Sequence, residues 1–276
     1  MSQNFRIATK EEEQRNQEFL KRMAKPKSFD YFEIIFCVIW VIGWILISMK
    51  GTIPWIVPTI ALLIGISGLI TFFCPYSAMK KGIKRSEYIE TMAPKFGFSD
   101  GISEKNKYLL FDTFELFLQK VSQSSQGVFS EIYSKEDNGR TTLLCTFSYG
   151  RCDLYYSSNI IFNIPQLKIP HIYIRSKGFL QDSFCWQGFQ QVNLASPFKW
   201  DVYSKYPLRV LPFCSDNSLQ YINNNFPKKL HLEAYDGNIL FFIHNNLEKP
   251  DGTLLFYYLA NSMCFIDQCW LNKTEI

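Results

Sequence analysis

Two long apolar runs lie close together near the start of the chain, and they are its strongest pattern. The first lies within Tyr31–Met49, the second within Ile53–Phe73, and only residues 50–52 separate them. A helix rises about 1.5 Å per residue, so each run approaches the roughly 30 Å of a bilayer's hydrocarbon core. The pattern predicts a transmembrane hairpin of two helices over residues 31–75.

Basic residues flank this predicted hairpin on its outer sides, whereas the turn between the runs carries Lys50 alone. Loops rich in Lys and Arg stay in the cytoplasm. We therefore expect an integral, two-pass membrane protein with cytoplasmic N- and C-termini and the lipid bilayer as a partner. The flanking residues are Arg6, Lys10, Arg15, Lys21, Arg22, Lys25 and Lys27 before the hairpin, and Lys80, Lys81, Lys84 and Arg85 after it.

The polar segment 1–30 precedes the hairpin. It carries Glu11, Glu12 and Glu13 followed by basic residues, which predicts a short solvated helix. The remaining segment, 86–276, is long enough to bury a core of its own. The chain therefore divides into a polar N-terminal segment (1–30), the hairpin (31–75) and one further domain (86–276).

Alternating apolar and polar residues in the C-terminal domain favour strands. Val128–Tyr133 and Thr141–Tyr149 flank an Asn-Gly pair, and Leu230–Tyr235 and Asn238–Ile243 flank an Asp-Gly pair. Both dipeptides supply the positive φ values that a two-residue hairpin turn needs. Further strands are expected at Ile169–Arg175, Phe198–Tyr203 and Leu208–Phe213.

Helical patterns are fewer in this domain. Ser86–Phe96 and Ser218–Phe226 read as short helices, and Tyr108–Val121 suits either a helix or a strand. The last segment places Leu255, Leu259, Met263, Ile266 and Trp270 on one face of a helix. The predicted fold class is α+β, a two-helix transmembrane hairpin followed by a β-rich antiparallel cytoplasmic domain with a few packed helices.

Several short aromatic motifs give the chain a resemblance to a known group. It resembles bacterial membrane proteins that have an N-terminal two-helix hairpin and a conserved C-terminal domain of unknown function. The resemblance implies a bacterial inner-membrane location and brings no activity with it. The motifs are Phe96-Gly97-Phe98, Phe114-Glu115-Leu116-Phe117, Phe147-Ser148-Tyr149, and Val192-Asn193-Leu194 followed by Phe198–Val202.

Charge and cysteine content narrow the function classes. The formal net charge of +4 does not indicate nucleic-acid binding, so no nucleic-acid partner is expected. The eight cysteines form no Cys-x-x-Cys pair, which favours free thiols in a reducing compartment. Cys145 and Cys152 with a histidine remain a possible zinc set, and Cys185 or Cys214 with a histidine a possible nucleophile pair. Neither rests on a motif.

The three histidines, His171, His231 and His244, have no second ligand at neighbouring helical or strand spacing. The chain also contains no nucleophile elbow, phosphate-binding glycine loop or zinc-protease motif. We therefore predict no catalytic, cofactor-binding or metal-binding residues and no cofactor.

These observations favour a membrane-anchored, non-enzymatic module whose cytoplasmic domain binds a protein partner or the inner membrane surface. Two alternatives remain. One is an enzyme that acts on a membrane-associated substrate through an unrecognised Cys/His site. The other is a hairpin protein that an intracellular bacterium inserts into a host membrane. The partner's identity and the oligomeric state are not determined by the sequence.

Overall fold

The computed structural model describes residues 4–23, 28–49, 59–60, 63, 65, 80–121, 126–149, 155–176, 188–194, 200–227, 230–244 and 252–271. The chain divides into two units. One comprises residues 10–85, and the other comprises residues 1–9 together with residues 86–276.

The unit of residues 10–85 contains α1 (Lys10–Met23) and α2 (Ser28–Met49). The predicted solvated helix after Thr9 is confirmed as α1, with its acidic residues in the first turn. Gly65 packs closely on α2, since a Cβ atom there would lie 2.8 Å from Val41 Cγ2. The rest of the predicted second membrane helix, Ile53–Phe73, lies outside the described residues apart from residues 59, 60 and 63.

The first predicted membrane run falls within α2, and apolar side chains of this helix such as Ile39 and Leu46 are exposed. Among the described residues, however, no helix is both long and apolar enough to cross a bilayer. Asp30 and Glu33 lie in its first turns, and the uncharged part, Ile34–Met49, rises only about 24 Å. This finding contradicts the predicted transmembrane hairpin, and with it the predicted two-pass integral membrane location with cytoplasmic ends.

The second unit is built on a ten-stranded sheet with the order β1-β3-β4-β5-β10-β9-β6-β8-β7, and β2 pairs with β3. The strands are β1 (Asn4–Ile7), β2 (Ser99–Asp100), β3 (Gln126–Asp137), β4 (Arg140–Tyr149), β5 (Tyr155–Asn163), β6 (Ile172–Ser176), β7 (Gln190–Gln191), β8 (Trp200–Ser204), β9 (His231–Tyr235) and β10 (Asn238–His244).

The sheet is mixed, whereas the sequence predicted an antiparallel one. The N-terminal strand β1 pairs in parallel with β3, and the other pairings among the described strands are antiparallel. A parallel neighbour needs a long connection, and residues 8–125 supply it. The prediction of an antiparallel sheet was wrong because the parallel strand β1 lies more than a hundred residues before its partner β3, where no local pattern marks the pairing.

Both predicted hairpins are confirmed. The β3–β4 turn has positive φ at Asn138 and Gly139, and the β9–β10 turn has positive φ at Asp236 and Gly237. Residues with positive φ at both central positions match the right-handed twist of paired strands. Strands predicted near β6 and β8 are also found.

The helices of this unit occupy both sides of the sheet. Residues 86–92 are helical and lead into η1 (Ala93–Phe96), as predicted for this segment. Tyr108–Val121, whose sequence suits either a helix or a strand, lies within helix α4 (Glu104–Val121). The strand expected at Leu208–Phe213 is wrong, because Pro207 and Pro212 stand at the starts of α5 (Pro207–Val210) and η3 (Leu211–Cys214), where a missing N–H costs nothing.

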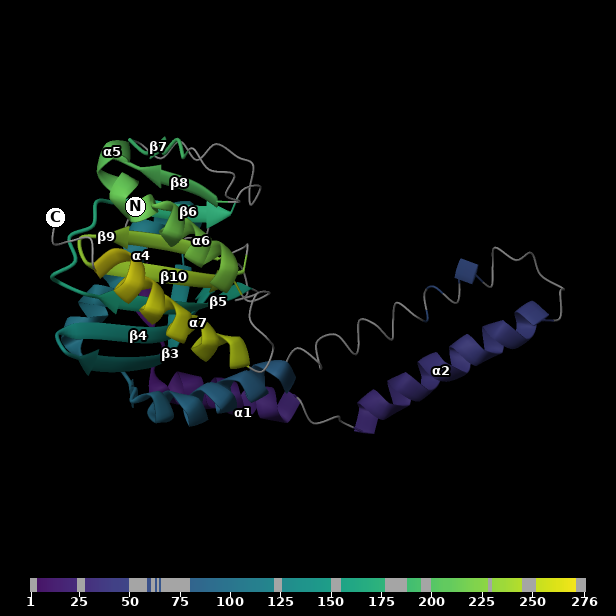
Figure 1. The fold of residues 1–276 in the computed structure, drawn as a ribbon. Helices are drawn as coiled ribbons and strands as arrows, with labels where there is room; N and C mark the ends of the chain where they lie inside the picture. Colours follow the sequence, from purple (N-terminus) through teal and green to yellow (C-terminus); the bar gives the residue numbers. More distant parts are fainter. Residues whose placement is uncertain are drawn as a thin grey trace. The chain divides into compact units, whose positions relative to one another are not determined.

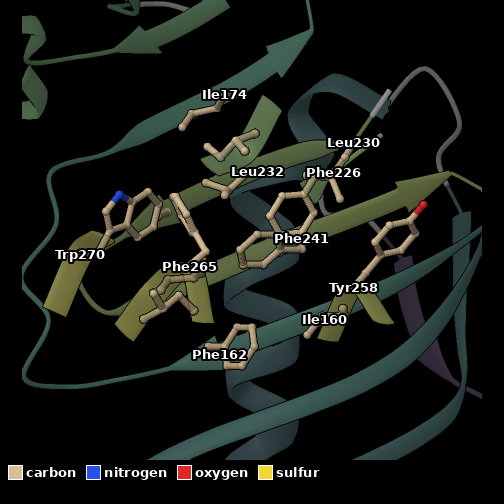
Figure 2. Packing of buried hydrophobic residues seen from close by; sticks show 14 of the residues in the cluster. Ile160, Phe162, Ile174, Phe226, Leu230, Leu232, Phe241, Tyr258, Phe265 and Trp270 are labelled. Atoms are coloured by element: carbon tan, nitrogen blue, oxygen red, sulfur yellow. The ribbon is translucent and has the colours of Figure 1, made fainter. Parts of the chain in front are cut away.

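Helices near the C-terminus cover one face of the sheet. Figure 1 shows α6 (Asp216–Asn225) and α7 (Thr253–Phe265) on this face, and η4 (Ile266–Trp270) continues α7. Their side chains and those of the strands form one buried cluster, which we call the α7 core (Figure 2). Its labelled members are Ile160, Phe162, Ile174, Phe226, Leu230, Leu232, Phe241, Tyr258, Phe265 and Trp270.

The opposite face of the sheet carries a second buried cluster, which we call the α4 core because Leu110 of α4 belongs to it. Strand side chains alternate between the two faces, so neighbouring residues such as Phe241 and Phe242 enter different cores. The α4 core comprises Leu110, Phe129, Ile132, Leu143, Cys145, Phe147, Ile161, Tyr173, Leu240 and Phe242.

Candidate functional site

A cavity of about 490 Å³ lies between the turn of the β3–β4 hairpin and the C-terminal helix α7. Binding cavities for small ligands commonly fall between roughly 300 and 1,000 Å³. The lining side chains come from η1 and the residues after it, both strands of the hairpin, the loop after β5, α7 and η4. They are Phe96, Phe98, Lys135, Asp137, Asn138, Arg140, Thr142, Gln166, Leu259, Met263 and Asp267.

The cavity contains an apolar part. Phe98 and Leu259 are buried members of the α7 core, and Met263 packs against that core while remaining half-buried. Phe96 is partly exposed and stacks on Phe256 with 4.8 Å between the ring centroids. An apolar group that enters the cavity would therefore meet a surface held in place by the core.

Charged side chains add a polar part to the lining. Arg140 Nη2 donates to Asp267 Oδ1 at 2.6 Å, which joins β4 to η4. Lys135 Nζ donates to the carbonyl oxygen of Phe96 at 3.1 Å, which fixes η1 against β3. These two contacts join four elements, β3, β4, η1 and η4, around the cavity.

The cavity offers groups for apolar contact and for hydrogen bonding. Its lining residues supply amide, hydroxyl, carboxylate and cationic groups, but include no histidine, cysteine or serine. Asp267, one of the two carboxylates, is paired with Arg140. The arrangement suits recognition of a bound group, since general acid–base or nucleophilic catalysis needs a positioned partner pair.

A second polar arrangement lies on the α4 side of the sheet. We call it the histidine cluster, and it comprises His171, Tyr173, His231, Glu233 and His244. His171 Nε2 donates to Glu233 Oε1 at 2.6 Å, and the Tyr173 hydroxyl lies 2.7 Å from His231 Nδ1. Nε2 of His231 is 3.3 Å from Nε2 of His244. His231 lies on β9, His244 on β10 and His171 immediately before β6, so all three histidines of the chain meet here.

Burial keeps this cluster away from water. His171, Tyr173, His231 and Glu233 are buried, and His244 is half-buried. Burial raises the pKa of the Tyr173 phenol, and the neighbouring Glu233 carboxylate raises it further. Tyr173 therefore remains a neutral hydroxyl at physiological pH.

The cysteines do not join the histidines among the described residues. Burial raises the pKa of the Cys145 thiol, and a hydrogen bond from Asn159 only partly offsets this. Two strands, β5 and β10, separate Cys145 from His231. Cys214 belongs to the α7 core, on the other face of the sheet. Cys152 and Cys185, the other cysteines in the predicted zinc and nucleophile pairs, lie outside the described residues.

The sequence predicts no site residues, and no motif in it marks either arrangement. For the histidine cluster a signal was present, because the Asp-Gly turn fixes the register of β9 and β10. It pairs His231 with Phe242, which puts His244 two residues further along on the same face. The cavity has no comparable signal, since its lining residues span positions 96 to 267.

In the part of the chain that the structure describes, no group of three or more His, Cys, Asp or Glu side chains is arranged to hold a metal ion.

Comparisons with known proteins add one structural likeness. No protein-family model matches the chain, and no curated protein matches it either. The chain is similar to the crystal structure of the mycobacterial trehalose monomycolate transport factor A, TtfA, with a TM-score of 0.44 and 12% identity over 67% of this chain and 94% of that chain. At these values the likeness transfers neither fold nor function. The resemblance to bacterial hairpin proteins therefore stays a prediction.

Proposed function

We propose that the unit built on the sheet is a binding module, and that its cavity receives an apolar side chain of a protein partner. The cavity beside Met263 is the observation that supports this proposal, because it combines apolar side chains with charged ones. Protein interfaces have the same organisation, in which a desolvated apolar centre is surrounded by polar groups.

A protein partner fits this cavity because the groups around it suit a peptide chain. Asn138 and Gln166 present side-chain amides, which can both donate to and accept from a peptide backbone. The Arg140–Asp267 pair is partly exposed, so it can rearrange toward polar groups of a partner at little cost. Met263 adapts to apolar side chains of different shape, as methionine does at other recognition surfaces.

Catalysis by a Cys/His pair receives less support from the described residues. The raised pKa keeps the Cys145 thiol protonated, and a protonated thiol is a poor nucleophile. Cys214 lies on the face of the sheet opposite the histidine cluster. For these reasons we propose binding as the function.

Peptide selection against the full chain tests the proposal. A random-peptide phage library would be panned on the unaltered protein, and the affinity of synthetic versions of enriched peptides measured by fluorescence anisotropy. Met263→Lys places a charge in the apolar part of the cavity, where its desolvation opposes binding of an apolar side chain. We expect this variant to bind the peptides at least about tenfold more weakly, which corresponds to about 1.4 kcal/mol.

Leu208→Lys is the matched control, because Leu208 is 82% exposed on α5 and does not line the cavity. It adds the same charge and should leave the affinity unchanged. Peptides that bind Met263→Lys as tightly as the unaltered chain would refute the cavity as the docking site. Turnover that His171→Gln abolishes would instead favour the enzyme alternative.

A further inference from the structure

The β9–β10 hairpin brings two imidazole nitrogens unusually close together. Nε2 of His231 and Nε2 of His244 lie 3.3 Å apart, with 4.9 Å between the ring centroids. Each neutral imidazole has one nitrogen with a hydrogen and one with a lone pair. Two facing nitrogens at this separation are stable only with a shared proton or a shared cation, because two lone pairs repel each other.

The Tyr173 hydroxyl orients one of these rings. It lies 2.7 Å from Nδ1 of His231, on the side of the ring away from His244. When Nδ1–H donates to the Tyr173 oxygen, the lone pair of His231 is placed on Nε2 and faces His244. Histidines that bind metal ions are held in this way, with the second ring nitrogen bonded to a neighbouring oxygen.

We propose that His231 and His244 form a binding site for a divalent zinc-class metal ion, which both residues coordinate through Nε2. Zinc binds imidazole nitrogen at about 2.0–2.1 Å with tetrahedral angles, so two such nitrogens lie about 3.3–3.4 Å apart. The observed separation of 3.3 Å equals that value. Imidazole is also the ligand type that suits zinc, nickel and copper ions.

A buried carboxylate beside the pair supplies compensating charge. Glu233 follows His231 by two residues on the same face of β9. Two residues of a strand span about 6.6 Å along its axis. Its Oε1 accepts from His171, whereas its Oε2 is buried and has no hydrogen-bond partner among the described residues. The nearby cation Arg175 lies 3.9 Å from Asp201 and donates to Tyr203, so other groups share its charge.

Two protein ligands leave two tetrahedral positions open. No further described carboxylate, thiol or imidazole group completes a set of three. Water or a donor atom of a bound molecule would take these two positions. This inference is independent of the cavity and of the proposed function.

Zinc titration of the full chain tests the site. The protein would be treated with a chelator, dialysed and titrated with zinc chloride in a calorimeter. We expect one zinc ion per chain, and a loss of affinity of about tenfold or more in His244→Gln, which removes one of the two ligands. His244 is half-buried at the end of β10, so this variant is chosen ahead of one at the buried His231.

His171→Gln is the matched control, because His171 belongs to the same cluster but is bonded to Glu233 and is not one of the two proposed ligands. It should bind zinc as the unaltered chain does. Zinc should raise the unfolding midpoint of the unaltered chain and of His171→Gln, but not that of His244→Gln. The proposal is overturned if the unaltered chain binds no zinc, or if His244→Gln binds it with unchanged affinity.

Discussion

At the residue scale, two turns of the same type differ in what surrounds them. Gly139 and Gly237 each close a two-residue hairpin with positive φ, +73° and +85°. A Cβ atom at Gly139 would meet nothing within 4 Å, whereas one at Gly237 would lie 2.5 Å from the carbonyl oxygen of Ile164. The backbone of Ile164 cannot withdraw easily, because its N–H donates to the Gly237 carbonyl and its side chain is buried.

We therefore expect Gly237→Ala to lower the free energy of unfolding by about 3 kcal/mol, and Gly139→Ala by only about 1 kcal/mol. Both variants bear the backbone cost of a side chain at positive φ, about 1–2 kcal/mol, but only Gly237→Ala adds a steric clash. Urea unfolding followed by circular dichroism measures both values. Equal losses would show that the Ile164 carbonyl does not restrict this turn.

At the element scale, the N-terminal strand β1 is the least expected part of the sheet. Phe5 packs on Phe129 and Phe147, with ring centroids 6.3 and 6.0 Å away. Ala8 N donates to the carbonyl oxygen of Phe129 at 2.8 Å, which continues the pairing beyond the strand. The strand thus covers an edge of β3 that would otherwise expose unpaired backbone groups.

Phe5→Ala should lower the free energy of unfolding by about 2 kcal/mol, less than for a fully buried phenylalanine because Phe5 is only partly buried. Phe19→Ala on α1 is the control, since Phe19 is 57% exposed and its loss should change stability by no more than about 0.5 kcal/mol. Chemical denaturation of the two variants compares them directly. A similar small effect for both would mean that β1 contributes little to the sheet.

At the scale of the whole molecule, helices pack on both faces of the sheet, so its central strands bury polar as well as apolar groups. Ser157, Ser158 and Asn159 of β5 are fully buried, and Asn159 Nδ2 donates to Ser157. Cys145, on the neighbouring strand β4, is buried beside them. Such burial ties the stability of the fold to pH, because a buried thiol resists ionisation.

The raised pKa of Cys145 predicts a loss of stability at alkaline pH. Above the ordinary thiol pKa of about 8.5, the unfolded chain releases this proton and the folded chain retains it. Proton release then favours unfolding, so the free energy of unfolding falls by up to about 1.4 kcal/mol per pH unit from this residue. Urea titrations at several pH values between pH 8 and 10 measure the slope.

Cys145→Ala should have a shallower slope over this pH range than the unaltered chain, because the substitution removes the titrating group. Cys264→Ala provides the control, because it makes the same substitution at a cysteine that is exposed on α7. An unaltered slope in Cys145→Ala would contradict the prediction.

The sequence by itself determined those turns and helices that depend only on residues close together in the chain. The Asn-Gly and Asp-Gly turns, the helix α1 and the apolar face of α7 were predicted because turn chemistry and periodicity act over a few residues. The register of β9 and β10 also follows from the Asp-Gly turn, so the approach of His231 to His244 was readable from the sequence in principle.

Tertiary structure decided what depends on distant parts of the chain. The sequence of β5 does not alternate between apolar and polar residues, because both faces of this strand are buried. β1 is a strand only through its pairing with β3. The apolar run of residues 34–49 marked a helix correctly, but its uncharged part rises only about 24 Å, and no described helix is long and apolar enough to cross a bilayer. The cavity exists only where η1, the β3–β4 turn and α7 meet, and no local pattern encodes that meeting.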